Sequence, residues 1–156
     1  MALKPDRIET QTDVSFFSDA TATRGGVASV KSAGSGVSMD DASAVVEYTS
    51  ALGSAHPVGI LLNDIVDLDL TRQHVNWHKD EVQKGGKVTL LQVGQITTSN
   101  IETGAVPAAG SGAFVHNNGN LSTSGVGIGA HLGKKVGVFL SSKDSDGYAK
   151  VAINIA

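Results

Sequence analysis

Residues 135–155 read KVGVFLSSKDSDGYAKVAINI and contain the two features that decide the fold class. Apolar side chains occupy every second position of Ala149–Ile155, which is typical of a strand with one buried face. The Asp-Ser-Asp-Gly stretch at 144–147 favours a turn, because aspartate accepts backbone hydrogen bonds and glycine tolerates a left-handed conformation. We therefore predict a β-hairpin that pairs residues 135–140 with residues 148–155.

Two more hairpins are predicted before this one, each around residues that favour tight turns. Residues 117–120, Asn-Asn-Gly-Asn, and the pair Gly85-Gly86 tolerate the positive φ angles that such turns need. The predicted strand pairs are 113–116 with 121–123, and 76–82 with 87–93. Short strands separated by turns are typical of all-β domains. The predicted fold class is mainly β, as a small β-barrel or β-sandwich domain.

The first 44 residues differ from the rest, because they are small, polar and rich in glycine. Ile8–Phe16 alternates with period two, which predicts a strand, and glycine and serine then dominate through Gly36. We expect an extended N-terminal arm and Gly/Ser-rich linker over residues 1–44, followed by a β-rich domain over residues 45–156. The strand of the arm adds to the protein's own sheet, adds to the edge of a neighbouring subunit, or frays.

The composition argues against nucleic acid and membrane as partners. The formal net charge is −3, with 12 basic and 15 acidic residues, whereas binding to nucleic acid needs a clustered basic surface. No apolar run approaches the roughly 20 residues that span a bilayer. Charged residues make up 17% of the chain, below the usual quarter, which predicts a surface partly covered by other protein.

The histidine and cysteine content predicts no metal site and no cofactor. Cysteine is absent, which excludes thiolate ligands and fits synthesis in a reducing cytoplasm. His74 and His78 have an H-x-x-x-H spacing, but Val75 stands where a zinc protease has glutamate, and the flanks are strand-like. We interpret both histidines as structural or interface residues, and Trp77 as a core residue.

Patterns that would indicate catalysis are equally weak. Asp64, Asp67 and Asp69 cluster in the sequence, but nothing there predicts one carboxylate buried and another exposed, as acid–base chemistry requires. Residues 125–131 are rich in glycine but lack the strand and helix that flank a dinucleotide-binding loop. No serine stands in a G-x-S-x-G motif. We predict that the chain is not an enzyme.

Two stretches of the chain resemble the head decoration, or capsid cement, proteins of tailed bacteriophages. The first begins as GILLNDIVDLDLTRQH at 59–74, continues as NWHKDEV at 76–82 and ends as GKVTLL at 86–91. The second is the C-terminal hairpin with its Asp-Ser-Asp-Gly-Tyr turn. Together they cover about half of the chain. The first is distinctive of phage virion proteins, whereas the second recurs in many small barrels.

The resemblance implies a structural virion protein on the outer surface of a capsid, made in the host cytoplasm. Such a protein bridges capsomers and stabilises the head against the pressure of packaged DNA. Its implied partners are the major capsid protein of the same virion and further copies of itself, in a homotrimer. The residues expected to contact the capsid are Ile8, Val14, Phe16 and Phe17. The residues expected in the core or at the trimer seam are His74, Trp77 and His78.

The alternative function is a carbohydrate-binding adhesin or a tail-fibre-type module. Low-charge β domains serve this purpose too, but sugar sites favour exposed aromatic rings, and only 4% of the residues are aromatic. A small hydrolase is a third possibility, and it requires a pocket with perturbed carboxylates.

Overall fold

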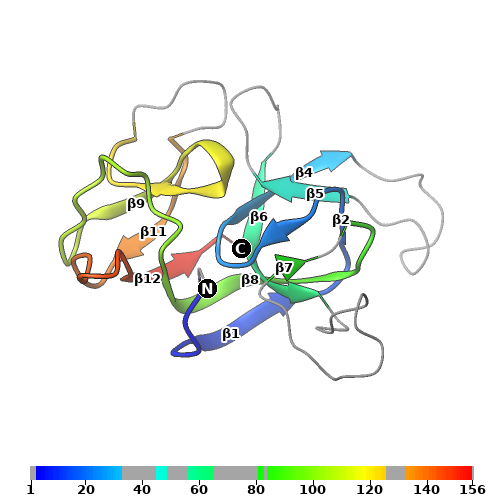
Figure 1. The fold of residues 1–156 in the computed structure, drawn as a ribbon, viewed down its shortest axis with the longest axis horizontal. Helices are drawn as coiled ribbons and strands as arrows, with labels where there is room; N and C mark the ends of the chain where they lie inside the picture. Colours follow the sequence, from blue (N-terminus) through cyan, green and yellow to red (C-terminus); the bar gives the residue numbers. More distant parts are fainter. Residues whose placement is uncertain are drawn as a thin grey trace.

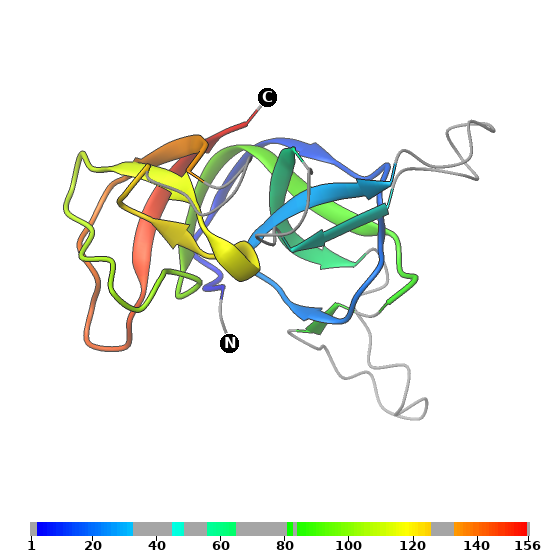
Figure 2. The ribbon, with the colours of Figure 1, turned by 90° about the horizontal axis from the view of Figure 1, so that it is seen from above.

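The computed structural model describes residues 3–32, 45–48, 56–64, 81–82, 84–125 and 133–155. The protein is mainly β, with one large mixed sheet of ten strands and a separate two-stranded sheet (Figures 1 and 2). The described residues contain no α-helix, and their one helical turn is the 3-10 helix η1 (Asn117–Gly119). In chain order the strands are β1 (Ile8–Asp13), β2 (Phe17–Ser18), β3 (Ala22–Thr23), β4 (Val27–Ser32), β5 (Val45–Tyr48), β6 (Pro57–Asp64), β7 (Glu81–Val82), β8 (Val88–Thr98), β9 (Gly112–Val115), β10 (Leu121–Ser122), β11 (Lys135–Phe139) and β12 (Ala149–Asn154).

The large sheet is open, so the prediction of a β-barrel is wrong. Its strand order is β10-β9-β11-β12-β8-β6-β4-β5-β2, with β1 attached to β8. A barrel requires its first and last strands to pair, and β10 and β2 are two-residue strands at opposite ends of this order.

Within the described residues, no helix is long and apolar enough to cross a membrane.

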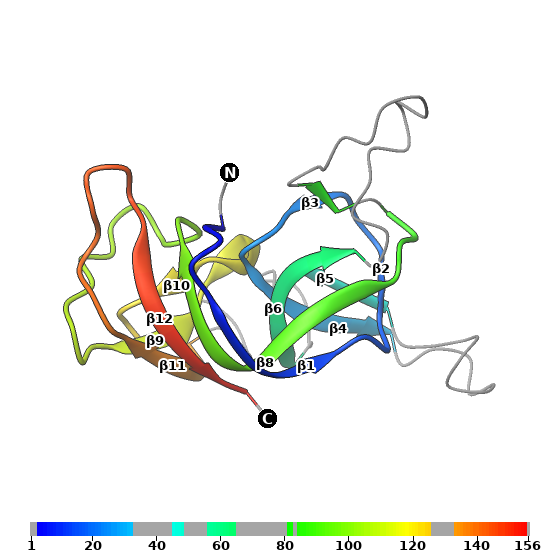
Figure 3. The ribbon, with the colours of Figure 1, turned by 90° about the horizontal axis from the view of Figure 1, so that it is seen from below.

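β8 joins the two groups of strands that Figure 3 shows on either side of it. Its 11 residues pair with β6 through Val88–Leu91, with β12 through Val93–Thr98 and with β1 through Leu90–Gln95. Leu90 and Leu91 are both fully buried, yet they belong to different apolar clusters. Because neighbouring side chains of a strand point to opposite faces, β8 is buried on both faces at Leu90 and Leu91.

The C-terminal hairpin is confirmed. β11 and β12 are antiparallel, and Ala149, Val151 and Ile153 are buried. In the turn between them, Asp144 Oδ1 accepts hydrogen bonds from the backbone N–H groups of Asp146 (3.0 Å) and Tyr148 (2.8 Å). Gly147 has a φ of 85°, as its predicted left-handed position requires. The hairpin of β9 and β10 around residues 117–120 is confirmed as well.

The predicted pairing of residues 76–82 with residues 87–93 is wrong where the structure describes it. β7 pairs with β3 in the small sheet, through Ala22↔Val82 and Thr23↔Glu81. Gly85 does adopt a positive φ of 82°, so the turn itself forms. β8 instead pairs with β6, β12 and β1 in the large sheet, and its residues contribute to both apolar clusters.

β4 lies in the glycine- and serine-rich stretch that the sequence predicts to be a linker. It pairs with both β5 and β6, and Val27 and Ala28 are buried. The small residues allow neighbours to approach closely, since a Cβ on Gly26 would stand 2.8 Å from the Tyr48 ring. The valines of β4, Val27 and Val30, stand three positions apart, so the strand lacks the period-two alternation on which sequence interpretation depends.

The N-terminal segment runs along β8 and its preceding turn. Leu3 pairs with Thr98, β1 pairs with β8, and Phe17 pairs with Lys87. The sequence left three alternatives for this strand: the protein's own sheet, the edge of a neighbouring subunit, or a frayed end. The structure has β1 in the protein's own sheet. Residues 33–44, where the predicted arm ends, lie outside the described residues.

Candidate functional site

The four side chains predicted to contact a capsid divide into two exposed and two half-buried residues. Ile8 is 54% exposed and Val14 is 47% exposed. Phe16 packs against the cluster that contains Leu90, and the Phe17 ring centroid lies 5.7 Å from Lys87 Nζ. The phenylalanines therefore hold the segment on the protein, while Ile8 and Val14 remain available to a partner.

β1 is an edge strand within the described part of the chain. It pairs with β8 alone, and five of its six residues are exposed. Its ladder is irregular at Gln11, where the register shifts on either side. At the end of β1, Asp13 Oδ1 accepts a hydrogen bond of 2.7 Å from the Ser15 N–H, which turns the chain out of the extended run. An unpaired edge is a template on which another chain adds a strand.

The residues predicted for the core or a trimer seam, His74, Trp77 and His78, lie outside the described residues. The same is true of Asp67 and Asp69, so their roles stay predictions. Among the residues that the structure does describe, no group of three or more histidine or acidic side chains is placed to hold a metal ion.

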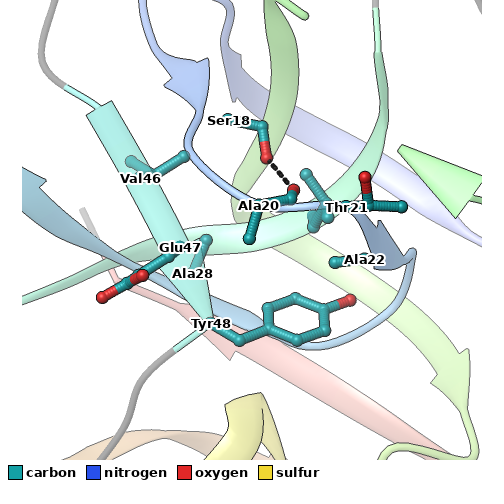
Figure 4. A pocket seen from close by; sticks show the side chains of 9 residues that line it. Ser18, Ala20, Thr21, Ala22, Ala28, Val46, Glu47 and Tyr48 are labelled. Atoms are coloured by element: carbon teal, nitrogen blue, oxygen red, sulfur yellow. Dashed lines mark hydrogen bonds between the residues drawn. The ribbon is translucent and has the colours of Figure 1, made fainter. Parts of the chain in front are cut away.

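A cavity of about 160 Å³ lies between β5 and the segment that joins β2 to β3 (Figure 4). Ser18, Thr21, Glu47 and Tyr48 are the polar residues of its lining, which is otherwise alanine, valine and leucine. The Ser18 hydroxyl donates a hydrogen bond of 2.6 Å to the Ala20 carbonyl. This cavity offers room for a small apolar group.

Glu47 and Tyr48 in the lining of this cavity contact structural partners. Lys31 Nζ lies 3.1 Å from Glu47 Oε2 and also pairs with Asp19. Burial raises the pKa of Tyr48 to about 12, so its hydroxyl stays protonated and donates to the Thr23 carbonyl. The same hydroxyl accepts a hydrogen bond of 3.1 Å from the Gly26 N–H. These contacts fix the loop before β4.

A second hollow, of about 250 Å³, was not foreseen from the sequence. Its lining residues come from the chain before β1 and the loop before β4: Leu3, Lys4, Pro5, Arg7 and Arg24. The only local signal is the spacing of Lys4, Pro5 and Arg7 beside a predicted strand. Arg24 is separated from them in sequence, and only the pairing of both segments within the fold brings it near.

No family model matches the chain, and no curated protein has a significantly similar sequence.

Proposed function

We propose that the chain is a capsid decoration protein, a β-sandwich-type domain whose N-terminal arm binds the outer surface of a tailed-phage head. It bridges capsomers of the major capsid protein and stabilises the head against the pressure of packaged DNA. It acts as a homotrimer, in which His74, Trp77 and His78 lie in the core or at the seam. The proposal starts from the resemblance to such proteins of residues 59–74, 76–82 and 86–91 and of the C-terminal hairpin.

The exposed edge of β1 is the observation that supports this function best. The described residues include four large apolar side chains that are exposed, and two of them, Ile8 and Val14, flank this edge. An exposed strand edge with apolar side chains invites pairing with another chain, and soluble proteins normally protect such edges. A capsid segment that adds to β1 would satisfy its backbone and cover both side chains.

A weak contact between each docked chain and the capsid is sufficient to stabilise the shell, because the same contact recurs at many sites. Burial of a large apolar side chain contributes about 1.5–3 kcal/mol, and Ile8 and Val14 are already partly covered. Each docked chain therefore adds only a few kcal/mol from these side chains. A trimer engages several capsid subunits at once, so its apparent affinity rises steeply without stronger individual contacts. Ligands that bind only the assembled state stabilise it by mass action.

Co-sedimentation with undecorated, expanded heads of the cognate phage tests this function. We expect saturable binding of the wild-type chain at a fixed ratio to the major capsid subunit. The double variant Ile8→Ser, Val14→Ser should bind about tenfold more weakly, because about 1.4 kcal/mol of apolar burial is lost. Point variants are preferable to deletion of residues 1–35, which would also remove the buried strand β4.

Val106→Ser is the matched control, because Val106 is 85% exposed and lies outside the N-terminal segment. It should bind heads as the wild type does. Equal weakening by Val106→Ser would contradict a specific role for β1. Absence of wild-type binding to cognate heads would contradict the proposed function and make a glycan array the next experiment.

A further inference from the structure

The chain leaves the edge of β8 just before β1. Leu3 pairs with Thr98 and Ile8 pairs with Gln95, so two residues of β8 separate the two partners. On the N-terminal side, the four residues 4–7 separate Leu3 from Ile8. The Lys4 N–H still donates a hydrogen bond of 2.9 Å to the Thr97 carbonyl, and the extra length beyond it cannot fit in the ladder, so residues 5–7 bulge away. The hollow of about 250 Å³ opens beside this bulge.

The lining of this hollow has a single sign of charge. Lys4, Arg7 and Arg24 are cationic, and the other two lining residues, Leu3 and Pro5, are apolar. Cations against apolar walls favour an anion in the space between them, although Asp144 and Glu9 already balance part of the charge of Lys4 and Arg7. Its volume of about 250 Å³ greatly exceeds the roughly 30 Å³ share of one water molecule, so it has room for a side-chain carboxylate.

Two of these cations are held in position by acidic residues that do not line the hollow. Lys4 Nζ lies 3.2 Å from Asp144 Oδ2 and 4.3 Å from the centroid of the Tyr148 ring. Arg7 Nε forms an ion pair with Glu9. Ordering of long cationic side chains before a ligand arrives reduces the entropy that binding would otherwise cost.

We propose that this hollow binds a carboxylate from an acidic side chain of the capsid segment that docks along β1. The inference rests on the proposed function. Arg7 immediately precedes β1, so a strand added to that edge brings one of its end residues next to the hollow. Guanidinium groups bind carboxylates through two parallel hydrogen bonds, which would fix the register of the added strand.

The isolated chain tests the carboxylate specificity by an NMR titration. N-acetylglutamate α-amide, whose one carboxylate is that of the side chain, should shift the backbone amides of Lys4, Arg7 and Arg24 in a saturable way, whereas N-acetylglutamine α-amide, its neutral analogue, should not. Arg7→Gln should weaken this binding about tenfold, and Lys4→Gln should do the same. Lys84→Gln removes an equal charge from a side chain that is 70% exposed and does not line the hollow, and should leave binding unchanged.

An equal response to both probes, or equal weakening by Arg7→Gln and Lys84→Gln, would overturn the carboxylate site. Co-sedimentation with heads then tests the source of the carboxylate, and Arg7→Gln should bind about tenfold more weakly than Lys84→Gln. Equal head binding by these variants would overturn the capsid assignment. If the wild-type chain fails to bind heads, the proposed function fails together with that assignment, while the titration still decides whether the hollow selects carboxylates.

Discussion

Gly137 lies where β11 and β12 approach too closely for a larger side chain. A Cβ at this position would meet the backbone carbonyl oxygen of Ala152 well inside van der Waals contact. We expect Gly137→Ala to lower the free energy of unfolding by about 1–3 kcal/mol, because the two strands must separate to admit a methyl group. Gly104→Ala is the control, since nothing lies within 4 Å of its Cβ position. Urea unfolding of both variants measures the difference, and equal stabilities would contradict the close approach.

Asp144 should contribute to the acid stability of the protein. The hydrogen bond from the Tyr148 backbone N–H, followed by the contact with Lys4, holds the pKa of Asp144 below its usual value of 3.8. A carboxyl with a lowered folded-state pKa stabilises the fold above its unfolded pKa and loses this contribution as the pH falls through its folded pKa.

Asp144→Asn should therefore have a lower free energy of unfolding than the wild type near neutral pH. This gap in free energy between the two proteins should narrow below about pH 4. Urea unfolding at a series of pH values measures this gap. Asp146→Asn removes an equal charge from the same turn and serves as the control. A gap for Asp144→Asn that stays constant down to acidic pH would contradict the assignment.

Two strands among residues 1–44 differ in their burial: β4 belongs to the core, whereas β1 lies on the surface. Val27 in β4 is fully buried, whereas Ile8 in β1 is 54% exposed. We expect Val27→Ala to lower the free energy of unfolding by about 2 kcal/mol, through lost apolar burial and an incompletely filled cavity. Ile8→Ala should change it by less than about 0.5 kcal/mol.

Thermal and urea unfolding of these two variants make the comparison. If both substitutions change the free energy of unfolding only slightly, β4 does not support the core. Residues 1–44 would then contribute little to the stability of the fold. A large loss of stability for Ile8→Ala would mean that β1 is needed for folding, and a defect in head binding could then not be assigned to β1 alone.

Element prediction from the sequence succeeded where a turn and its strands lie next to each other in the chain. The Asp-Gly turn at 146–147 and the Asn-Gly turn at 118–119 each mark a hairpin that forms. Gly85 also marks a real turn, yet β7 pairs with β3 instead of β8. Local turn chemistry predicts a reversal of the chain, but the partner of a strand depends on distant residues that compete for it.

β8 contributes side chains to both apolar clusters of the molecule, and we expect it to join them into one cooperative unit. It pairs with three strands, and Leu90, Leu91 and Ile96 are fully buried. We expect the β8 amides to exchange their hydrogens only through global unfolding, with the same free energy in both halves of the strand. Amides near the start of β1 should exchange at a lower free energy.

Native-state hydrogen exchange followed by NMR measures these free energies residue by residue. A difference between the β6-paired and the β12-paired halves of β8 would contradict a single unit. It would instead indicate two groups of strands that unfold separately. The prediction concerns folding alone, and its outcome does not depend on the identity of any partner.

Period-two alternation and turn residues are enough to predict a mainly β protein and the positions where its local hairpins turn, because both act over short distances. That the sheet stays open, and that β4 forms within a stretch rich in glycine and serine, becomes visible only in the folded molecule. Only the tertiary structure brings Arg24 to Lys4 and Arg7 around one hollow. These outcomes depend on packing and pairing between segments far apart in the chain, which no local pattern records.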